Sequence, residues 1–214
     1  MTLGTGFGGG LVTDGRLYLG DNSAGAEIWI MRSKLNPDSF AEEGASIRAV
    51  QRVYVRESGM DEEKPPDPKE IYEIALGERE GDRLAAMKAY TELGVVVGDA
   101  LANAVTLTDA LVVIGGGLSG AYRMFMPGLI GEMNGTIRTL EWQEIDRLEV
   151  KAFNLEDEQD LARFLRGDAR KVKVPGSGRH VDYDPMKRTG VGITKLGTSR
   201  ATAIGACAFA LANL

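Results

Sequence analysis

The chain has 214 residues, with 25 Lys or Arg against 31 Asp or Glu, so its formal net charge is −6. With 43% hydrophobic and 26% charged residues, its composition is that of a globular protein and excludes a disordered chain. The acidic balance argues against a nucleic-acid partner, which needs a clustered basic face. One cysteine and one histidine exclude an internal disulfide framework and Cys- or His-rich metal sites.

Neither a signal peptide nor a membrane span is expected. No charged n-region precedes an apolar run, and no stretch reaches the ~18 apolar residues that a span requires. We therefore expect a reduced, cytoplasmic protein without a membrane partner. The length fits one large domain or two small ones, and no linker or repeat marks a boundary.

Glycine is the most informative residue type. It accounts for 28 of 214 residues, well above the usual ~7%. Much of it lies in two runs, residues 4–10 (GTGFGGG) and 115–117 (GGG). Clustered glycine lets the backbone approach another group closely or adopt a positive φ.

The first 30 residues are predicted to be mainly β structure. The Thr-Asp-Gly of residues 13–15 separates apolar residues 11–12 from residues 16–19, which is a strong hairpin signal. Residues 26–31 are expected to form a third strand.

Three helices are expected next. The first covers residues 41–57, and the second begins after the cap Asp67, with Pro68 at its first position and Glu70 three residues after the cap. The third runs from about residue 82 to 107, where Gly94 and Gly98 suggest close packing against a neighbour. Its predicted buried stripe is Leu84, Met87, Leu93, Val97, Leu101 and Val105.

The second half alternates strands and helices, which indicates the α/β class. Residues 110–114 are apolar on both faces and are predicted to form a central strand. The second glycine run follows. Further strands are expected at 137–141, 148–153, 172–174 and 191–196, and helices at 122–133, 156–166 and from Thr198 or Ser199 onward, with Cys207 in the core.

Both glycine runs match the dinucleotide pattern Gly-x-Gly-x-x-Gly, which alone is weak evidence. The first run opens a strand and a hairpin, whereas a dinucleotide loop must open a helix. The second run follows an apolar strand, opens a helix and has Glu141 about 20 residues later, so an FAD- or NAD-binding Rossmann domain stays open.

The pair of runs also fits a nucleotide held across a sheet. A glycine loop in a hairpin can aim successive N–H groups at phosphates, while the second loop lies against the base. The alternative without a ligand is that both runs are tight turns.

Several segments together resemble the ROK family of sugar kinases and sugar-responsive repressors. The segments are residues 3–10 (LGTGFGGG), 14–18 (DGRLY), 20–22, 24–28 (AGAEI), 42–46 (EEGAS), 98–119 and 196–206. The resemblance spans most of residues 2–135 and 191–212.

The resemblance implies an actin-like ATPase (ribonuclease H-like) lobe, a mixed β-sheet with helices on both faces. In this fold two lobes close over ATP and a sugar, and residues 1–214 correspond to the C-terminal lobe. The N-terminal lobe, with its Asp-x-Gly-x-Thr loop and its catalytic aspartate, is not found in these residues. No catalytic residue is therefore assigned here, and the isolated chain is expected to be nearly inactive.

The implied activity is a glucokinase-like transfer of phosphate from ATP to a hexose hydroxyl, with Mg²⁺. The sugar contacts are expected from Glu27, whose carboxylate can accept two hydroxyls in a fork, and from Asn22. The nucleotide contacts are expected from Gly4, Thr5, Gly6, Gly8, Gly9, Gly115, Gly116, Gly117 and Leu118.

The sequence also departs from the family pattern. Ile30 stands where the family has a histidine, and residues 32–41 lack the thiols of its zinc loop, so zinc is not expected. The family implies a homodimer. The sequence leaves open whether the Trp29 side chain contacts a partner subunit, packs in the core or faces the sugar. A non-catalytic sugar-responsive regulator or oligomerisation lobe is the alternative function, and residues 141–190 receive no role.

Overall fold

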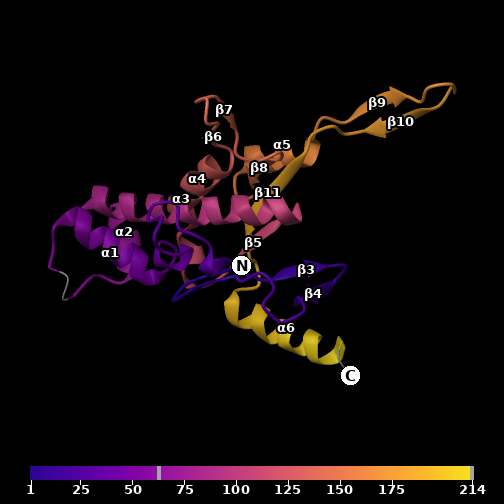
Figure 1. Cartoon of the computed structure of the whole chain (residues 1–214). Helices are drawn as coiled ribbons and strands as arrows, with labels where there is room; N and C mark the ends of the chain where they lie inside the picture. Colours follow the sequence, from indigo (N-terminus) through magenta and orange to yellow (C-terminus); the bar gives the residue numbers. More distant parts are fainter. Residues whose placement is uncertain (62–63, 213–214) are drawn as a thin grey trace.

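The computed structural model describes residues 1–61 and 64–212 (Figure 1). The first half contains strands β1 (Thr2–Leu3), β2 (Phe7–Gly8), β3 (Leu11–Thr13) and β4 (Arg16–Tyr18), 3-10 helices η1 (Ile28–Ile30) and η2 (Ala41–Glu43), and helices α1 (Ile47–Ser58), α2 (Pro68–Leu76) and α3 (Arg83–Thr108). The second half contains β5 (Val112–Ile114), η3 (Gly117–Ala121), α4 (Tyr122–Met133), β6 (Thr136–Arg138), β7 (Glu144–Asp146), β8 (Lys151–Asn154), α5 (Glu158–Arg166), β9 (Arg170–Lys173), β10 (His180–Tyr183), β11 (Arg188–Ile193) and α6 (Thr198–Ala212).

A parallel sheet in the order β5–β11–β8 forms the centre, and two-stranded antiparallel hairpins surround it. Successive side chains of a strand point to opposite faces. On β8, Ala152 belongs to the main core, whereas Phe153 packs edge-on against Phe164 of α5. Helices therefore cover both faces of a sheet, as expected.

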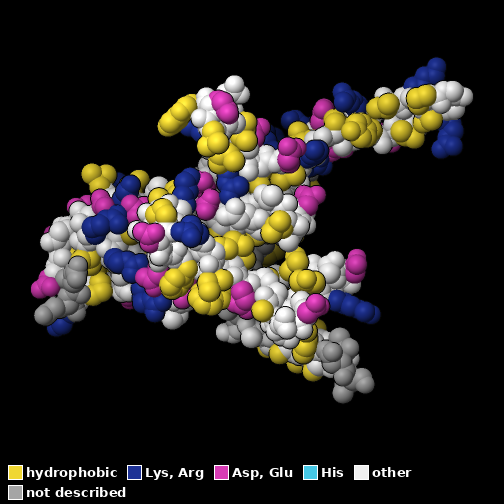
Figure 2. Space-filling model, in the orientation of Figure 1, with side chains coloured by type: hydrophobic (Ala, Val, Ile, Leu, Met, Phe, Trp, Pro, Cys, Tyr) yellow, Lys and Arg dark blue, Asp and Glu magenta, His cyan; other side chains and the backbone are white. Residues whose placement is uncertain are grey.

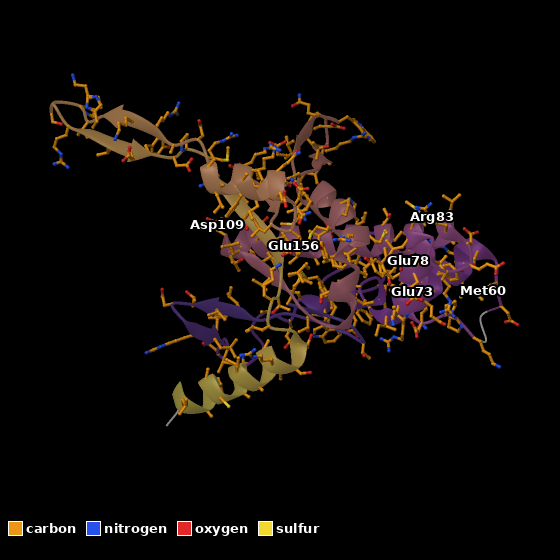
Figure 3. All side chains as sticks on the ribbon, turned by 180° about the vertical axis from the view of Figure 1, so that it is seen from behind. Met60, Glu73, Glu78, Arg83, Asp109 and Glu156 are labelled. Atoms are coloured by element: carbon orange, nitrogen blue, oxygen red, sulfur yellow. The ribbon has the colours of Figure 1, made fainter. Side chains whose placement is uncertain are left out.

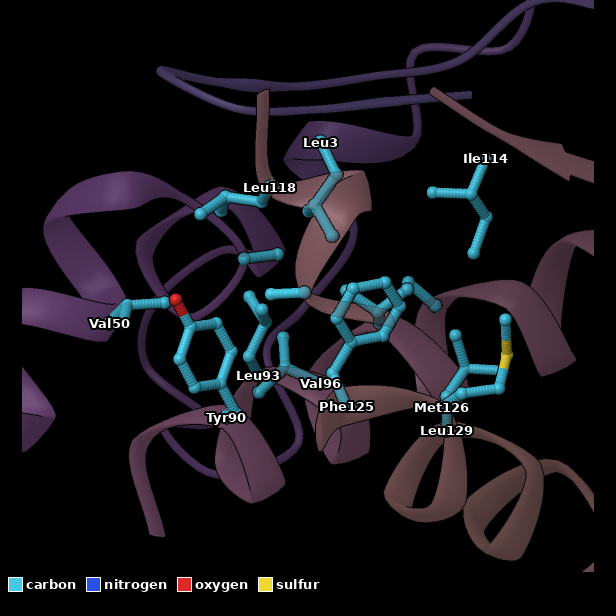
Figure 4. Close-up of a cluster of buried hydrophobic side chains, with 14 of the residues drawn as sticks. Leu3, Val50, Tyr90, Leu93, Val96, Ile114, Leu118, Phe125, Met126 and Leu129 are labelled. Atoms are coloured by element: carbon cyan, nitrogen blue, oxygen red, sulfur yellow. The ribbon is translucent and has the colours of Figure 1, made fainter. Parts of the chain in front are cut away.

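The main core lies around α3, which is buried against α1, α2 and α4. Figure 4 shows Leu93 and Val96 of α3 beside Phe125 of α4. A Cβ atom at Gly94 would lie 2.2 Å from the carbonyl oxygen of Phe125, and one at Gly98 would lie 2.6 Å from that of Leu129. The predicted close approach at these two glycines is confirmed.

The predicted stripe of α3 is correct only in its second part. Val97, Leu101 and Val105 are buried with Leu93, but Leu84 is 78% exposed and Met87 is 42% exposed. Leu84 precedes Leu93 by nine residues, which at ~100° per residue is about half a turn around the helix. Smaller residues, Ala85, Ala86 and Ala89, fill the buried positions of the first turns.

Strand β5 is the outer strand of the three-stranded sheet, but it has backbone hydrogen-bonded neighbours on both sides, β11 on one and residues 1–3 on the other. Along its other side, the Met1 ammonium donates to the Val113 carbonyl over 2.8 Å, the Gly115 N–H donates to the Met1 carbonyl over 2.9 Å, and the Leu3 N–H donates to the Gly115 carbonyl over 2.8 Å. Val113 is 55% exposed, because its side chain points to the opposite face of the sheet from those of the buried Val112 and Ile114. An apolar sequence predicts burial of side chains, but it does not determine the order of strands.

Two other expectations also differ from the structure. Residues 26–31 form no strand, because Ala26 has a φ of +64° and its carbonyl accepts from the Ile28 N–H, which starts η1. Cys207 is exposed on α6, which projects beyond β11 (Figure 1). Among residues 1–61 and 64–212, no helix has the length and apolar character needed to cross a membrane.

Candidate active site

The first glycine run forms a tight turn between β1 and β2, which pair antiparallel with Leu3 opposite Phe7. The Gly4 N–H donates to the Gly6 carbonyl over 3.0 Å, and the Phe7 N–H donates to Oε2 of Glu42 over 3.0 Å. Among the described residues, the N–H groups of Thr5 and Gly6 have no partner. Two donors at the tip of the turn are thus available to an anion.

The second glycine run lies directly beside this turn. Gly116 has a φ of +101°, and a Cβ there would lie 2.3 Å from the Leu3 carbonyl oxygen, so packing requires glycine. Its N–H donates to Oγ1 of Thr198 over 3.0 Å. Gly117 differs, because a Cβ there would meet no described atom within 4 Å. The side of Gly117 on which a side chain would stand is therefore open, so a flat ligand can approach its backbone there.

Both runs line one pocket of about 610 Å³, a size typical of small-molecule sites. The runs meet where a Cβ at Gly4 would lie 3.4 Å from the Gly117 nitrogen. The pocket adjoins the carboxyl ends of β5 and β11, which is where open α/β sheets bind ligands. Its wall consists of Thr2, Gly4, Thr5, Gly6, Phe7, Gly8, Trp29, Glu42, Gly116, Gly117 and Thr198.

Six predicted nucleotide contacts share this wall: Gly4, Thr5, Gly6, Gly8, Gly116 and Gly117. The other three lie off it. A Cβ at Gly9 would lie 2.4 Å from the Ala26 carbonyl oxygen, and one at Gly115 would lie 3.2 Å from the Thr194 side chain. Leu118 is buried in the core. Packing explains these three positions, and nucleotide binding by the six stays a prediction.

The two predicted sugar contacts, Glu27 and Asn22, are exposed and lie off the pocket wall. Oε2 of Glu27 accepts a hydrogen bond from the Trp29 indole over 2.5 Å. Trp29 itself is in the wall, edge-on to Phe40. Glu27 therefore does not line the pocket itself but contacts Trp29, which does.

Sequence reasoning missed Glu42 and Thr198. Glu42 is the charged side chain in the described pocket wall, and it reaches a turn 35 residues earlier in the chain. No local pattern could have found that long-range contact. Thr198 is the first residue of α6, and its place at a helix start could be predicted from the sequence. That its hydroxyl accepts a hydrogen bond from the Gly116 N–H could not, because the two residues lie 82 positions apart.

Glu156 holds the segment that connects β11 to Thr198 (Figure 3). Its carboxylate accepts from the Ile193 N–H over 2.8 Å and from the Lys195 ammonium over 2.6 Å. Burial acts to raise the pKa of the Glu156 carboxyl, but these two hydrogen bonds outweigh it and lower the pKa below its usual value. Glu156 is therefore ionised at neutral pH and fixes this part of the pocket frame.

A parallel sheet with helices on both faces, and with glycine turns at the carboxyl ends of its strands, defines an α/β ligand-binding lobe. The family model of the ROK family matches residues 1–158. The chain belongs to the ROK family, and its fold is the actin-like ATPase fold. The Rossmann interpretation is wrong, because β6 pairs with β7 outside the central sheet and Glu141 lies between them.

A glucokinase from Parabacteroides distasonis has 49% sequence identity with this chain and superposes with a TM-score of 0.89. The similarity covers 100% of this chain and 57% of the glucokinase, so the chain spans little more than half of that relative. No curated protein matches the chain.

Two more distant structures show the fold alone. A protein of Cytophaga hutchinsonii described as a sugar kinase has 19% identity and a TM-score of 0.57, over 93% of this chain and 52% of its own. A ROK family protein from Streptococcus pneumoniae, in complex with sucrose, has 19% identity and a TM-score of 0.50, over 69% of this chain and 49% of its own.

Proposed function

We propose that residues 1–214 are the C-terminal, ATP-binding and sugar-contacting lobe of a hexose kinase that phosphorylates a hydroxyl of glucose. Membership of the ROK family and 49% identity with a glucokinase support this activity and this sugar. One observation carries the proposal: two glycine runs, whose first residues are 111 positions apart in sequence, line one pocket with unpartnered N–H groups at one of its loops. A cytoplasmic location, where ATP is available, is part of the proposal.

In this proposal the N–H groups of Thr5 and Gly6 and the Thr5 hydroxyl bind the terminal phosphates of ATP. No Lys or Arg is present in the described pocket wall, so Mg²⁺ supplies the positive charge. Among the described residues no group of three or more His, Cys, Asp or Glu could hold a metal ion, so the ion would be held mainly by the phosphates of ATP and by water, as Mg²⁺ commonly is. Adenine or ribose lies on the open backbone of Gly117.

The sugar lies at the Glu42 and Trp29 side of the pocket. A carboxylate repels phosphate but accepts hydroxyl hydrogen bonds strongly, so Glu42 suits a sugar. Trp29 offers an apolar ring to a sugar face, and Glu27 orients that ring through its indole N–H. Asn22 is a weaker candidate at the rim. The activating aspartate comes from an N-terminal lobe outside these residues.

Titration calorimetry of the chain with a non-hydrolysable ATP analogue and with glucose tests the proposal. We expect both to bind. Replacing Gly117 by Ala should abolish binding of the analogue without lowering Tm, because the added methyl group meets only open space. Gly131→Ala, on the exposed face of α4, is the matched control and should bind normally. Glucose binding without nucleotide binding would instead favour a sugar-responsive regulator.

A further inference from the structure

Glu42 lies directly against the turn that is proposed to bind phosphate. Its Oε2 accepts from the Phe7 N–H over 3.0 Å, and a Cβ atom at Gly6 would lie only 2.7 Å from the same oxygen. The N–H groups of Thr5 and Gly6, which have no partner among the described residues, are the neighbouring donors of this turn. A carboxylate therefore already occupies one edge of a turn whose N–H groups suit an anion.

Little positive charge compensates this carboxylate. Within the described part of the chain, Glu42 is the one charged side chain of the pocket wall. The Arg48 guanidinium lies 3.6 Å from Oε1 of Glu42, but it is also 3.8 Å from Glu43 and is 60% exposed, so solvent weakens the pairing. Figure 2 shows acidic and basic side chains mixed over the helical part of the molecule, and the chain has a net charge of −6. The surroundings thus do little to offset the charge of Glu42.

Phosphate and sugar act on this carboxylate in opposite ways. A phosphate group at Thr5 and Gly6 brings a second negative charge beside it, and like charges at such close range repel each other. Sugar hydroxyls instead donate hydrogen bonds to a carboxylate, which can accept about four. Since the Phe7 N–H uses one of these positions, others remain for a sugar. Hydroxyl donors draw the negative charge toward the sugar, and a hydroxyl that replaces Phe7 at Oε2 frees a third N–H for phosphate.

We propose that Glu42 makes ATP binding depend on the sugar: without sugar its carboxylate repels the terminal phosphates, and a bound sugar relieves that repulsion. A repulsive group is one of the general means by which a site gains specificity. Two ligands that meet at one side chain in this way bind cooperatively, and each raises the affinity for the other by the same factor. The pocket then holds ATP chiefly when a sugar hydroxyl is there to accept phosphate, which limits transfer to water. This inference rests on the proposed function, because it places both ligands in this pocket.

Titration calorimetry of the 214-residue chain tests this coupling. A non-hydrolysable ATP analogue with Mg²⁺ is titrated without glucose and at saturating glucose. We expect its Kd to fall about fivefold or more when glucose is present, and the Kd of glucose to fall by the same factor when the analogue is present. Two ligands that bind with unchanged Kd values would overturn this inference and leave the proposed function standing. A chain that does not bind the analogue even with glucose would overturn both.

Glu42→Gln removes the charge but keeps an oxygen for the Phe7 N–H. The analogue alone should therefore bind about fivefold more tightly to this variant, the factor that glucose otherwise supplies. Glucose, raised to a concentration that saturates the variant, should no longer lower the Kd of the analogue. Glu43→Gln is the matched control, because Glu43 pairs with Arg52 at 3.0 Å outside the pocket wall, and it should leave the coupling intact.

A purely structural role for Glu42 gives a different expectation. A carboxylate that only held the turn could be replaced by the amide of Gln, and the Kd of the analogue and its response to glucose would both stay as they are. That result contradicts the proposal. So does weaker binding of the analogue by Glu42→Gln, or an equal loss of coupling in Glu43→Gln.

Discussion

Glu42 combines a structural and a proposed binding role in one carboxylate. Its Oε2 accepts from the Phe7 N–H and so fixes the turn that presents Thr5 and Gly6. Its Oε1 lies 3.6 Å from Arg48. Since the side chain also lines the pocket, the residue couples the shape of the phosphate turn to the place where the sugar is proposed to bind.

Replacing Glu42 by Gln separates these roles. The amide oxygen of Gln still accepts from the Phe7 N–H, so Tm should be nearly unchanged, while the loss of charge weakens hydroxyl hydrogen bonds. We expect glucose affinity to fall about tenfold or more, measured by calorimetry. The adjacent Glu43→Gln is the control, because Glu43 pairs with Arg52 outside the pocket wall. Equal losses in both variants would count against a sugar contact at Glu42.

At the scale of elements, the crossing of α3 and α4 depends on glycine. Gly94 and Gly98 of α3 face backbone atoms of α4. In the other direction, a Cβ atom at Gly128 of α4 would lie 3.0 Å from the Thr91 carbonyl oxygen of α3. Backbone cannot move aside as a flexible side chain can. Small residues at this crossing therefore set the distance between the two helices.

Gly94→Ala should lower the free energy of unfolding by about 3 kcal/mol, the upper range for overpacking, because its methyl group would lie 2.2 Å from the Phe125 carbonyl oxygen. Gly131→Ala, with open space around it, should instead raise stability by roughly 0.5–1 kcal/mol through helix propensity. Urea unfolding measures both. A similar sign for the two variants would show that the crossing tolerates a methyl group.

At the scale of the whole molecule, the proposed kinase needs more chain than these residues. The chain spans 57% of the length of its glucokinase relative. In a coupled hexokinase assay the 214-residue chain should turn over at least ~100-fold more slowly than a protein completed by an N-terminal lobe, since a general base contributes 10²–10⁴. Robust turnover by the 214 residues alone would place the base within them.

Local sequence determined the features that depend on nearest neighbours. The Asp-Gly turn between β3 and β4 is one of them. Another is the capping box of α2, in which the Glu70 N–H donates to Asp67 and the Asp67 N–H donates to Glu70. The glycine runs also predicted a ligand-binding role and the family, because close backbone approach needs residues without a side chain.

Only the tertiary structure decided which residues share the pocket and which apolar side chains stay exposed. Glu42 reaches Phe7, and Gly116 contacts Leu3, through contacts 35 and 113 residues apart in the chain. Equally, the exposure of Val113 and of Trp142 depends on what packs beside them. Hydrophobic patterning specifies that a side chain prefers burial, but the tertiary structure of the whole chain decides which residues bury it.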